Sequence, residues 1–371
     1  MPGTVSQAFP AESSDSGMIL VSLAEGLNQE AQATQAFGNA RLRVLKEQSP
    51  VDWKAVAQEL ETRLTPLEVY LDQIEPELGS ESIYVAHKWY DPFGMLPELA
   101  FFKATARGYA LRAELMAIRG DRKGALRQLE SIRLLAQGIR ETPMLLHFLV
   151  AIACDAIGMS SATNCMTADP GGAHEYAEAA SFDEQILEKD LARALRVDAF
   201  MTVQTVRGFR MGWRKFEWGI DPERGQSDAL PRDIGARIAL AYFLEDSVEV
   251  LKAISPDGGL DIPALRMAEN NDSVAPSWVP PELITSRSTT QQLYNAFASR
   301  RTMMVLAEWI ETGEIPRSLP TDPYAGAPLK AKRQDGNLVV YSVGWDGRDD
   351  GGDMRYGRDL IMSIRESSIR R

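Results

Sequence analysis

The chain has 371 residues, a formal net charge of −12 and 44% hydrophobic residues. This length can bury a large core and predicts two or three domains. The ordinary apolar content and the mean hydropathy of −0.22 exclude a mainly disordered chain. The acidic balance argues against general nucleic-acid binding, which needs a basic surface, and is compatible with cation binding. We expect no run that approaches the roughly 18 continuous apolar residues of a membrane span, and the first residues lack the pattern of a signal peptide.

The two cysteines, Cys154 and Cys165, lie eleven residues apart in one predicted helix. This spacing places them at roughly opposed angular positions, so we expect no disulfide between them. No CxxC pair points to zinc or redox chemistry. We expect two buried structural thiols.

Most of the chain has helical patterning. We interpret 1–16 as a loose tail, 17–254 as a helical domain, 255–281 as a linker rich in proline and glycine, and 282–371 as a second unit. Predicted helices in the first part cover 17–48, 53–64, 65–74, 143–168, 181–208 and 230–254. Ser181 with Glu184 has the spacing of a capping box. A last long helix is predicted over 282–312, closed by Gly313.

The clearest helical unit is a pair of helices around Gly120. Apolar residues recur at helical spacing at Leu99, Phe102, Ala106, Tyr109, Ala113 and Met116, and again from 125 to 139. Arg119-Gly120-Asp121 predicts a helix stop followed by a new N-cap. The unit resembles a tetratricopeptide-type helix–turn–helix. Only one copy is visible, so an irregular helical bundle and a short solenoid both remain open.

An aromatic segment at 79–95 interrupts the helical pattern. It contains Trp89, Tyr90 and Phe93, and aromatic surfaces with a few polar groups are typical of ligand clefts. The alternative is a loop that packs on neighbouring helices.

A second aromatic segment, 207–218, interleaves basic residues with rings. Arg210, Trp213 and Trp218 could lie at a membrane surface or stack on a partner. The alternative is an ordinary helix end whose arginine stems pack on aromatic rings.

The C-terminal part changes from helical to extended patterning. Asp335-Gly336 is a strong hairpin-turn signal, and 338–343 is the strand that follows it. The next loop gathers four carboxylates among glycines, at Asp346, Asp349, Asp350 and Asp353. Calcium takes six to eight oxygen ligands from carboxylates and carbonyls, and a cation would relieve the repulsion between these aspartates. The spacing does not match an EF-hand, and a solvated acidic turn is the alternative.

This ending resembles a known family. A long helix, then Leu319-Pro-Thr-Asp-Pro-Tyr-Ala-Gly-Ala-Pro-Leu329, then Tyr341-Ser-Val-Gly-Trp-Asp-Gly-Arg-Asp-Asp-Gly-Gly352, is similar to the C-terminal part of the major pseudopilins of type II secretion. It also resembles the ending of a group of helical bacterial envelope proteins. The resemblance spans about 291–353. It implies a helix packed on a small antiparallel sheet, and a calcium-binding loop with ligands among Asp346, Asp349, Asp350 and Asp353 and backbone carbonyls near Val343. Arg300 and Arg301 in the helix do not favour polymerisation into a fibre.

The expected fold is therefore mainly α, an irregular helical bundle or short tetratricopeptide-like solenoid followed by a small pseudopilin-like α+β module. The expected function is a non-enzymatic protein of the bacterial envelope or periplasm, associated with secretion, with a calcium-stabilised loop and a helical surface for a protein or peptide partner. One alternative is a cytoplasmic helical adaptor without metal. The other is a carboxylate-based hydrolase or lyase, for which no spacing defines a nucleophile, a base and an oxyanion donor together.

Overall fold

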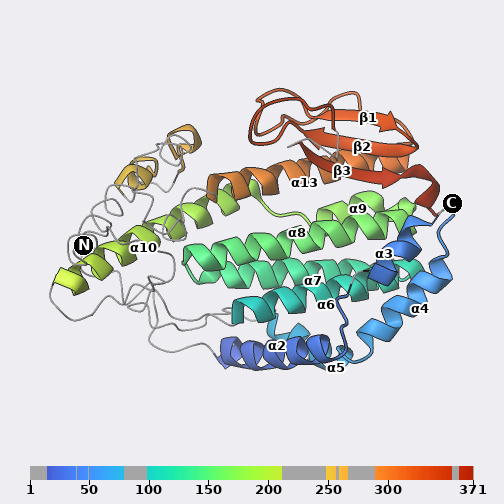
Figure 1. The fold of residues 1–371 in the computed structure, drawn as a ribbon, viewed down its shortest axis with the longest axis horizontal. Coiled ribbons are helices and arrows are strands. Elements are labelled where there is room, and N and C mark those ends of the chain that lie inside the picture. The colour runs from blue at the N-terminus through green and yellow to red at the C-terminus, as the bar shows by residue number, and fades with distance from the viewer. Residues whose placement is uncertain are drawn as a thin grey trace, which may run out of the picture.

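The computed structural model describes residues 15–38, 40–48, 50–78, 98–210, 248–255, 259–265, 289–352 and 359–370. Long helices stack side by side, and a three-stranded antiparallel sheet lies over one of them near the C-terminus (Figure 1). The predicted fold class, mainly α with a small α+β module, is confirmed.

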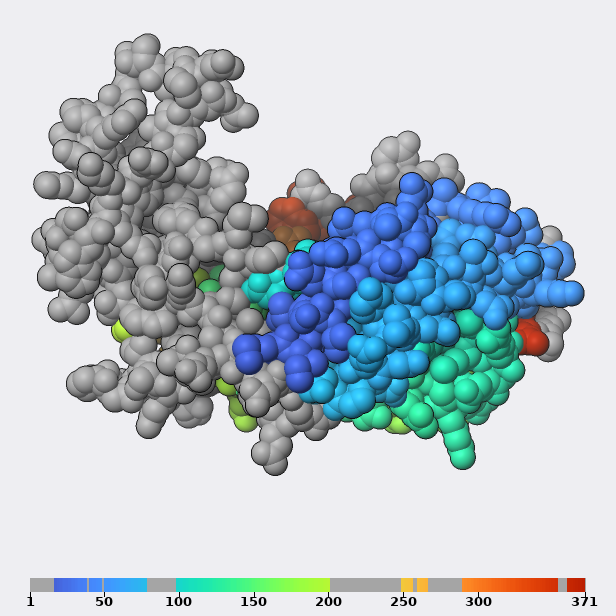
Figure 2. All heavy atoms as spheres, turned by 90° about the horizontal axis from the view of Figure 1, so that it is seen from below, coloured from blue at the N-terminus to red at the C-terminus, as the bar shows by residue number. Residues whose placement is uncertain are grey.

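Four helices form the N-terminal part of the described chain: α2 (Asp15–Ala33), α3 (Ala40–Glu47), α4 (Trp53–Leu64) and α5 (Glu68–Leu78). In Figure 2 they form part of the face seen from below, coloured blue. Helix α4 has the predicted bounds, because the Asp52 carboxylate accepts the Lys54 and Ala55 amides as its N-cap. The single helix expected over 17–48 is wrong, since the chain turns at Gln35 with φ of +51°.

The centre of the bundle consists of α6 (Glu98–Arg119), α7 (Arg122–Glu141) and α8 (Leu145–Ala168), which pack against one another. Both predicted apolar stripes face this core, with only Met116 half-buried. Gly120 adopts φ of +83°, and the Asp121 carboxylate accepts the Gly124 amide at 3.0 Å. The predicted helical hairpin is confirmed.

Helix α8 is the most apolar element. It is long and apolar enough to cross a membrane, and 67% of its most apolar window is buried inside the fold, as in a core helix. The sequence expectation that no segment approaches this composition is therefore corrected. Cys154 and Cys165 are fully buried free thiols, as predicted, and His147 is 1% exposed.

After α8 the chain forms a 3-10 turn, η1 (Pro170–Gly172), the short helix α9 (Ala173–Ala179) and α10 (Glu184–Arg210). The predicted capping box is wrong. The carboxylate of Asp183 caps α10, while the Ser181 hydroxyl donates to the Ala177 carbonyl. Glu184 instead binds Arg300 and Arg301, because two cations across the interface are better partners than one backbone amide.

Helix α13 (Thr289–Thr312) lies between the bundle and the sheet (Figure 1). The sheet has the order β1 (Lys330–Gln334), β2 (Asn337–Ser342), β3 (Leu360–Arg365), and the 3-10 turn η5 (Glu366–Ser368) follows. One side of α13 joins the bundle core through residues such as Leu293 and Phe297. The other side, including Trp309, packs on Val340 and Ile364 of the sheet. Helix α13 therefore contributes to both the core of the helical bundle and the core beneath the sheet.

Candidate metal loop

The loop between β2 and β3 is positioned by a hairpin and by one buried carboxylate. Asp335 and Gly336 both have positive φ, +51° and +73°, so the predicted hairpin turn is confirmed. Asp322, 1% exposed, lies in the segment before β1. Its oxygens accept the Ser342 hydroxyl at 2.7 Å and the Val343 amide at 2.9 Å, where β2 ends. This residue therefore fixes the point at which the acidic loop begins.

Glycines give the loop its shape. Gly344, Gly347, Gly351 and Gly352 all have φ between +64° and +75°, a region that other residues rarely adopt. At Gly352 an added Cβ would also lie 2.9 Å from Cδ1 of Tyr341. This close approach brings the end of the loop back onto the sheet.

Asp349 is the most strongly engaged of the predicted ligands. Its carboxylate contacts Lys330 Nζ at 2.8 Å and accepts the Tyr341 hydroxyl at 3.3 Å and the Gly351 amide at 3.0 Å. The hydrogen bond from Lys330 lowers the pKa of Asp349, and the backbone amide adds to this effect. Burial raises the pKa of the Tyr341 hydroxyl to about 12, and the neighbouring Asp349 carboxylate adds to this effect. Asp346 accepts the Arg348 amide at 3.1 Å.

Asp359, just before β3, is a loop carboxylate that the sequence analysis did not single out. It is 9% exposed and accepts the Gly352 amide at 2.7 Å and the Asp350 amide at 3.4 Å. Burial raises its pKa, and the neighbouring charges of Asp350 and Asp349 raise it further. An acidic residue directly before an apolar strand was the available sequence signal.

The donor chemistry of this loop fits a hard cation, because its side chains offer carboxylate oxygens. Asp349 and Asp350 are close enough to Asp359 for the charge of each to raise its pKa. Within the described residues, however, no group of three or more acidic, histidine or cysteine side chains is arranged to hold a metal. Asp353 lies outside these residues, and Val343 is buried with its amide bound to Asp322.

The two predicted binding segments are largely outside the described residues. This applies to Trp89, Tyr90, Phe93, Trp213 and Trp218. Arg210 is the last residue of α10. Both segments stay predictions.

Comparisons with protein-family models, with curated proteins and with solved structures find no match to this chain.

Proposed function

We propose that this is a non-enzymatic binding protein of the bacterial envelope, associated with secretion, whose C-terminal loop is ordered by calcium. Asp349, Asp350 and Asp359 are not arranged as a ligand set in this structure. Calcium would draw them together around the ion, with Asp346 and Asp353 from the sequence prediction. The helical part would offer the surface for a protein or peptide partner. The envelope setting rests on the pseudopilin resemblance of the C-terminal module.

The observation that carries the calcium proposal is the environment of Asp359. A carboxylate that is 9% exposed has two further aspartates as neighbours, and its burial and the charges of both aspartates raise its pKa. Two backbone amides act in the opposite direction but leave the net pKa raised. A bound divalent cation would stabilise all three ionised carboxylates at once, because it replaces like-charge repulsion with attraction.

Thermal unfolding with EDTA and with 10 mM calcium, followed by circular dichroism, tests this proposal. Calcium that binds only the folded state stabilises it by about RT ln(1 + [L]/Kd), which is roughly 1.4 kcal/mol at ten times Kd. We expect the midpoint to rise with calcium in the wild type and to stay constant in Asp350→Ala and Asp346→Ala. Glu308→Ala, an exposed change on α13 away from the loop, should keep the wild-type response. A midpoint that ignores calcium in the wild type would refute the proposal.

A cytoplasmic helical adaptor without metal is the second candidate. The ion pair between Lys330 and Asp349 favours it, because a protein cation already neutralises one proposed ligand. This candidate predicts identical unfolding curves in EDTA and in calcium. It also predicts that Lys330→Met lowers the unfolding midpoint equally in EDTA and in calcium. If calcium binds the loop, the variant should instead lower the midpoint in EDTA but not in calcium, because the bound ion then neutralises Asp349.

A further inference from the structure

A cavity of about 320 Å³ lies between the helical part and the sheet, away from the acidic loop. Its walls come from parts of the chain that are far apart in sequence: the end of α3 and start of α4, the C-terminal end of α6, the second half of α8, and the strands β2 and β3. Ligand pockets of proteins commonly begin at about this volume. It is large enough for a small organic molecule.

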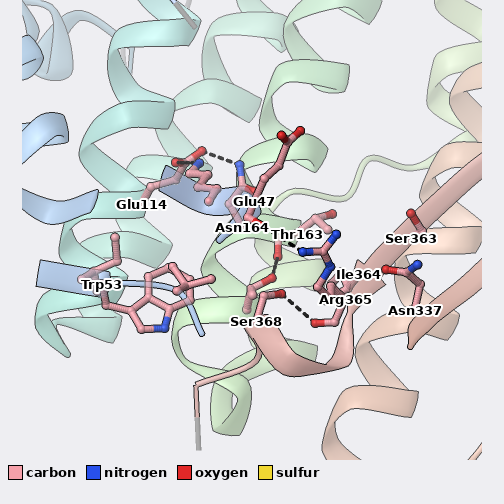
Figure 3. Close-up of a pocket in the computed structure, with 14 residues that line it drawn as sticks. Glu47, Trp53, Glu114, Thr163, Asn164, Asn337, Ser363, Ile364, Arg365 and Ser368 are labelled. Atoms are coloured by element: carbon pink, nitrogen blue, oxygen red, sulfur yellow. Dashed lines mark hydrogen bonds and ion pairs between the residues drawn. The ribbon is translucent and has the colours of Figure 1, made fainter. Parts of the chain in front are cut away.

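The helical wall of this cavity carries charges that already satisfy one another. Glu114, 7% exposed, contacts Lys46 Nζ at 2.6 Å and accepts the Asn164 amide at 2.7 Å. Glu47 contacts Arg43 at 2.7 Å. Figure 3 shows Glu114 and Asn164 on this side of the cavity. Neither acid therefore offers an unbalanced negative charge to a ligand.

The strand wall carries a cation with free donors. Arg365 donates from Nη1 to the Glu47 carbonyl at 2.8 Å. Within the part of the chain that the structure describes, its Nε and Nη2 groups have no hydrogen-bond partner, and neither does the hydroxyl of Ser363. Arg365 is directly opposite Asn337 across the antiparallel pair, and Ser363 lies two residues before it. These three side chains therefore share one face of the sheet, and Figure 3 shows all three at the cavity.

This arrangement matches a single negative charge. A guanidinium with unengaged Nε and Nη2 groups presents a fork that fits a carboxylate, and the Ser363 hydroxyl adds a donor beside it. The Asn337 amide nitrogen donates to the Asp335 carbonyl at 3.4 Å and has a second N–H to offer. The other charged side chains of the cavity are paired, so one uncompensated cation remains. A monoanion balances it, whereas a phosphate dianion would leave excess negative charge near Glu47 and Glu114. The half-buried Trp53 and Val51 give the cavity an apolar part for the body of the molecule.

We propose that this cavity binds a small organic carboxylate, held by Arg365 and Ser363 with Asn337 beside them, such as the C-terminal carboxylate of an amino acid or short peptide. The ligand would bridge β3 and the helical part, because its carboxylate meets the strand wall while its body meets α4 and α8. This proposal is independent of calcium in the acidic loop.

N-acetylalanine is a suitable probe, and its amide, which has the same shape without the charge, is the matched control. With 15N-labelled full-length protein, the Nε–H signal of Arg365, assigned by its loss in Arg365→Gln, reports binding directly. We expect this signal to shift and saturate with N-acetylalanine, with Kd on the order of 1 mM for so small a molecule. The amide should produce no saturable shift. Inorganic phosphate should bind at least tenfold more weakly.

Variants make the proposal falsifiable. Arg365→Gln should weaken N-acetylalanine binding at least tenfold in saturation-transfer NMR, and Ser363→Ala severalfold. Arg317→Gln, which changes an exposed arginine outside the cavity, should leave it unchanged. If Arg365→Gln unfolds the module, Arg365→Lys keeps the charge without the fork and should bind more weakly than the wild type. The proposal would be overturned if N-acetylalanine and its amide bound equally well, or if phosphate bound more strongly than N-acetylalanine. It would also be overturned if Ser363→Ala and one of the two single Arg365 variants each bound N-acetylalanine as tightly as the wild type.

Discussion

Replacing Asp322 by alanine should destabilise the C-terminal module far more than its position in an irregular segment suggests. The carboxylate is 1% exposed and accepts three hydrogen bonds, from the Ser342 hydroxyl and from the amides of Val343 and Tyr324. These bonds join the segment before β1 to the end of β2. Alanine would leave the Ser342 and Val343 donors without a partner in a buried site.

The size of the effect follows from the donors. Hydrogen bonds to a charged group contribute about 1.5–3 kcal/mol each, and an unsatisfied buried donor costs about 1–3 kcal/mol. The bonds of Ser342 and Val343 are buried, whereas the Tyr324 amide is only partly buried and can regain water. We therefore expect Asp322→Ala to lower the free energy of unfolding by about 3–4 kcal/mol. Asp322→Asn should cost about 1–3 kcal/mol, because its amide group would face the Val343 amide.

Equilibrium urea unfolding, followed by circular dichroism and by tryptophan fluorescence, measures both variants. Trp309 is 1% exposed in the core beneath the sheet and reports on this module. Glu308→Ala, an exposed change on the same helix, should stay within about 0.5 kcal/mol of the wild type. A loss of less than 1 kcal/mol in Asp322→Ala, with an unchanged m-value, would show that the carboxylate does not hold the module in place.

Gly352→Ala should destabilise the fold by about 2 kcal/mol or more, because a left-handed φ of +64° adds to a Cβ contact of 2.9 Å with a tyrosine ring; Gly326→Ala, at φ +65° with nothing within 4 Å, should cost only about 1 kcal/mol in the same urea assay. Equal losses would exclude the ring contact as a cause. Arg122 of α7 donates hydrogen bonds to the Asp169 carboxylate and so lowers its pKa. The stability that this ion pair adds is therefore present above the ordinary aspartate pKa of about 4 and is lost as the pH falls through the lower folded value. The difference in unfolding free energy between wild type and Asp169→Asn should be largest near about pH 6 and should approach zero below about pH 3. A difference that does not vary with pH would contradict this assignment. Burial raises the pKa of Cys154 and Cys165, so neither thiol should react with Ellman's reagent in the native protein and both should react in urea. Rapid reaction before unfolding would show that the core opens there.

Local chemistry accounts for the elements that the sequence predicted well. Helix α4 begins after Asp52 because its side chain satisfies two amides of the first turn, and this signal is read from neighbouring residues alone. The turn at Gly120 and the hairpin at Gly336 are equally local, since each needs a residue that tolerates positive φ. The failures are also instructive. Glu184 has the spacing of a capping residue, yet it binds two arginines of α13, which no local pattern could show.

The sequence by itself determined the helical class, the C-terminal hairpin and the acidic, glycine-rich character of the loop, because each depends on residues close together in the chain. Only the tertiary structure decided which carboxylates are buried. Asp322 looks no different in sequence from Asp346, but packing against β2 removes it from water, and the folding of the loop onto Asp359 buries that carboxylate as well. The cavity beside Arg365 likewise exists only because β3 folds back onto helices that precede it by some three hundred residues. A side chain's burial and partners depend on such distant neighbours, and its spacing in the sequence does not specify them.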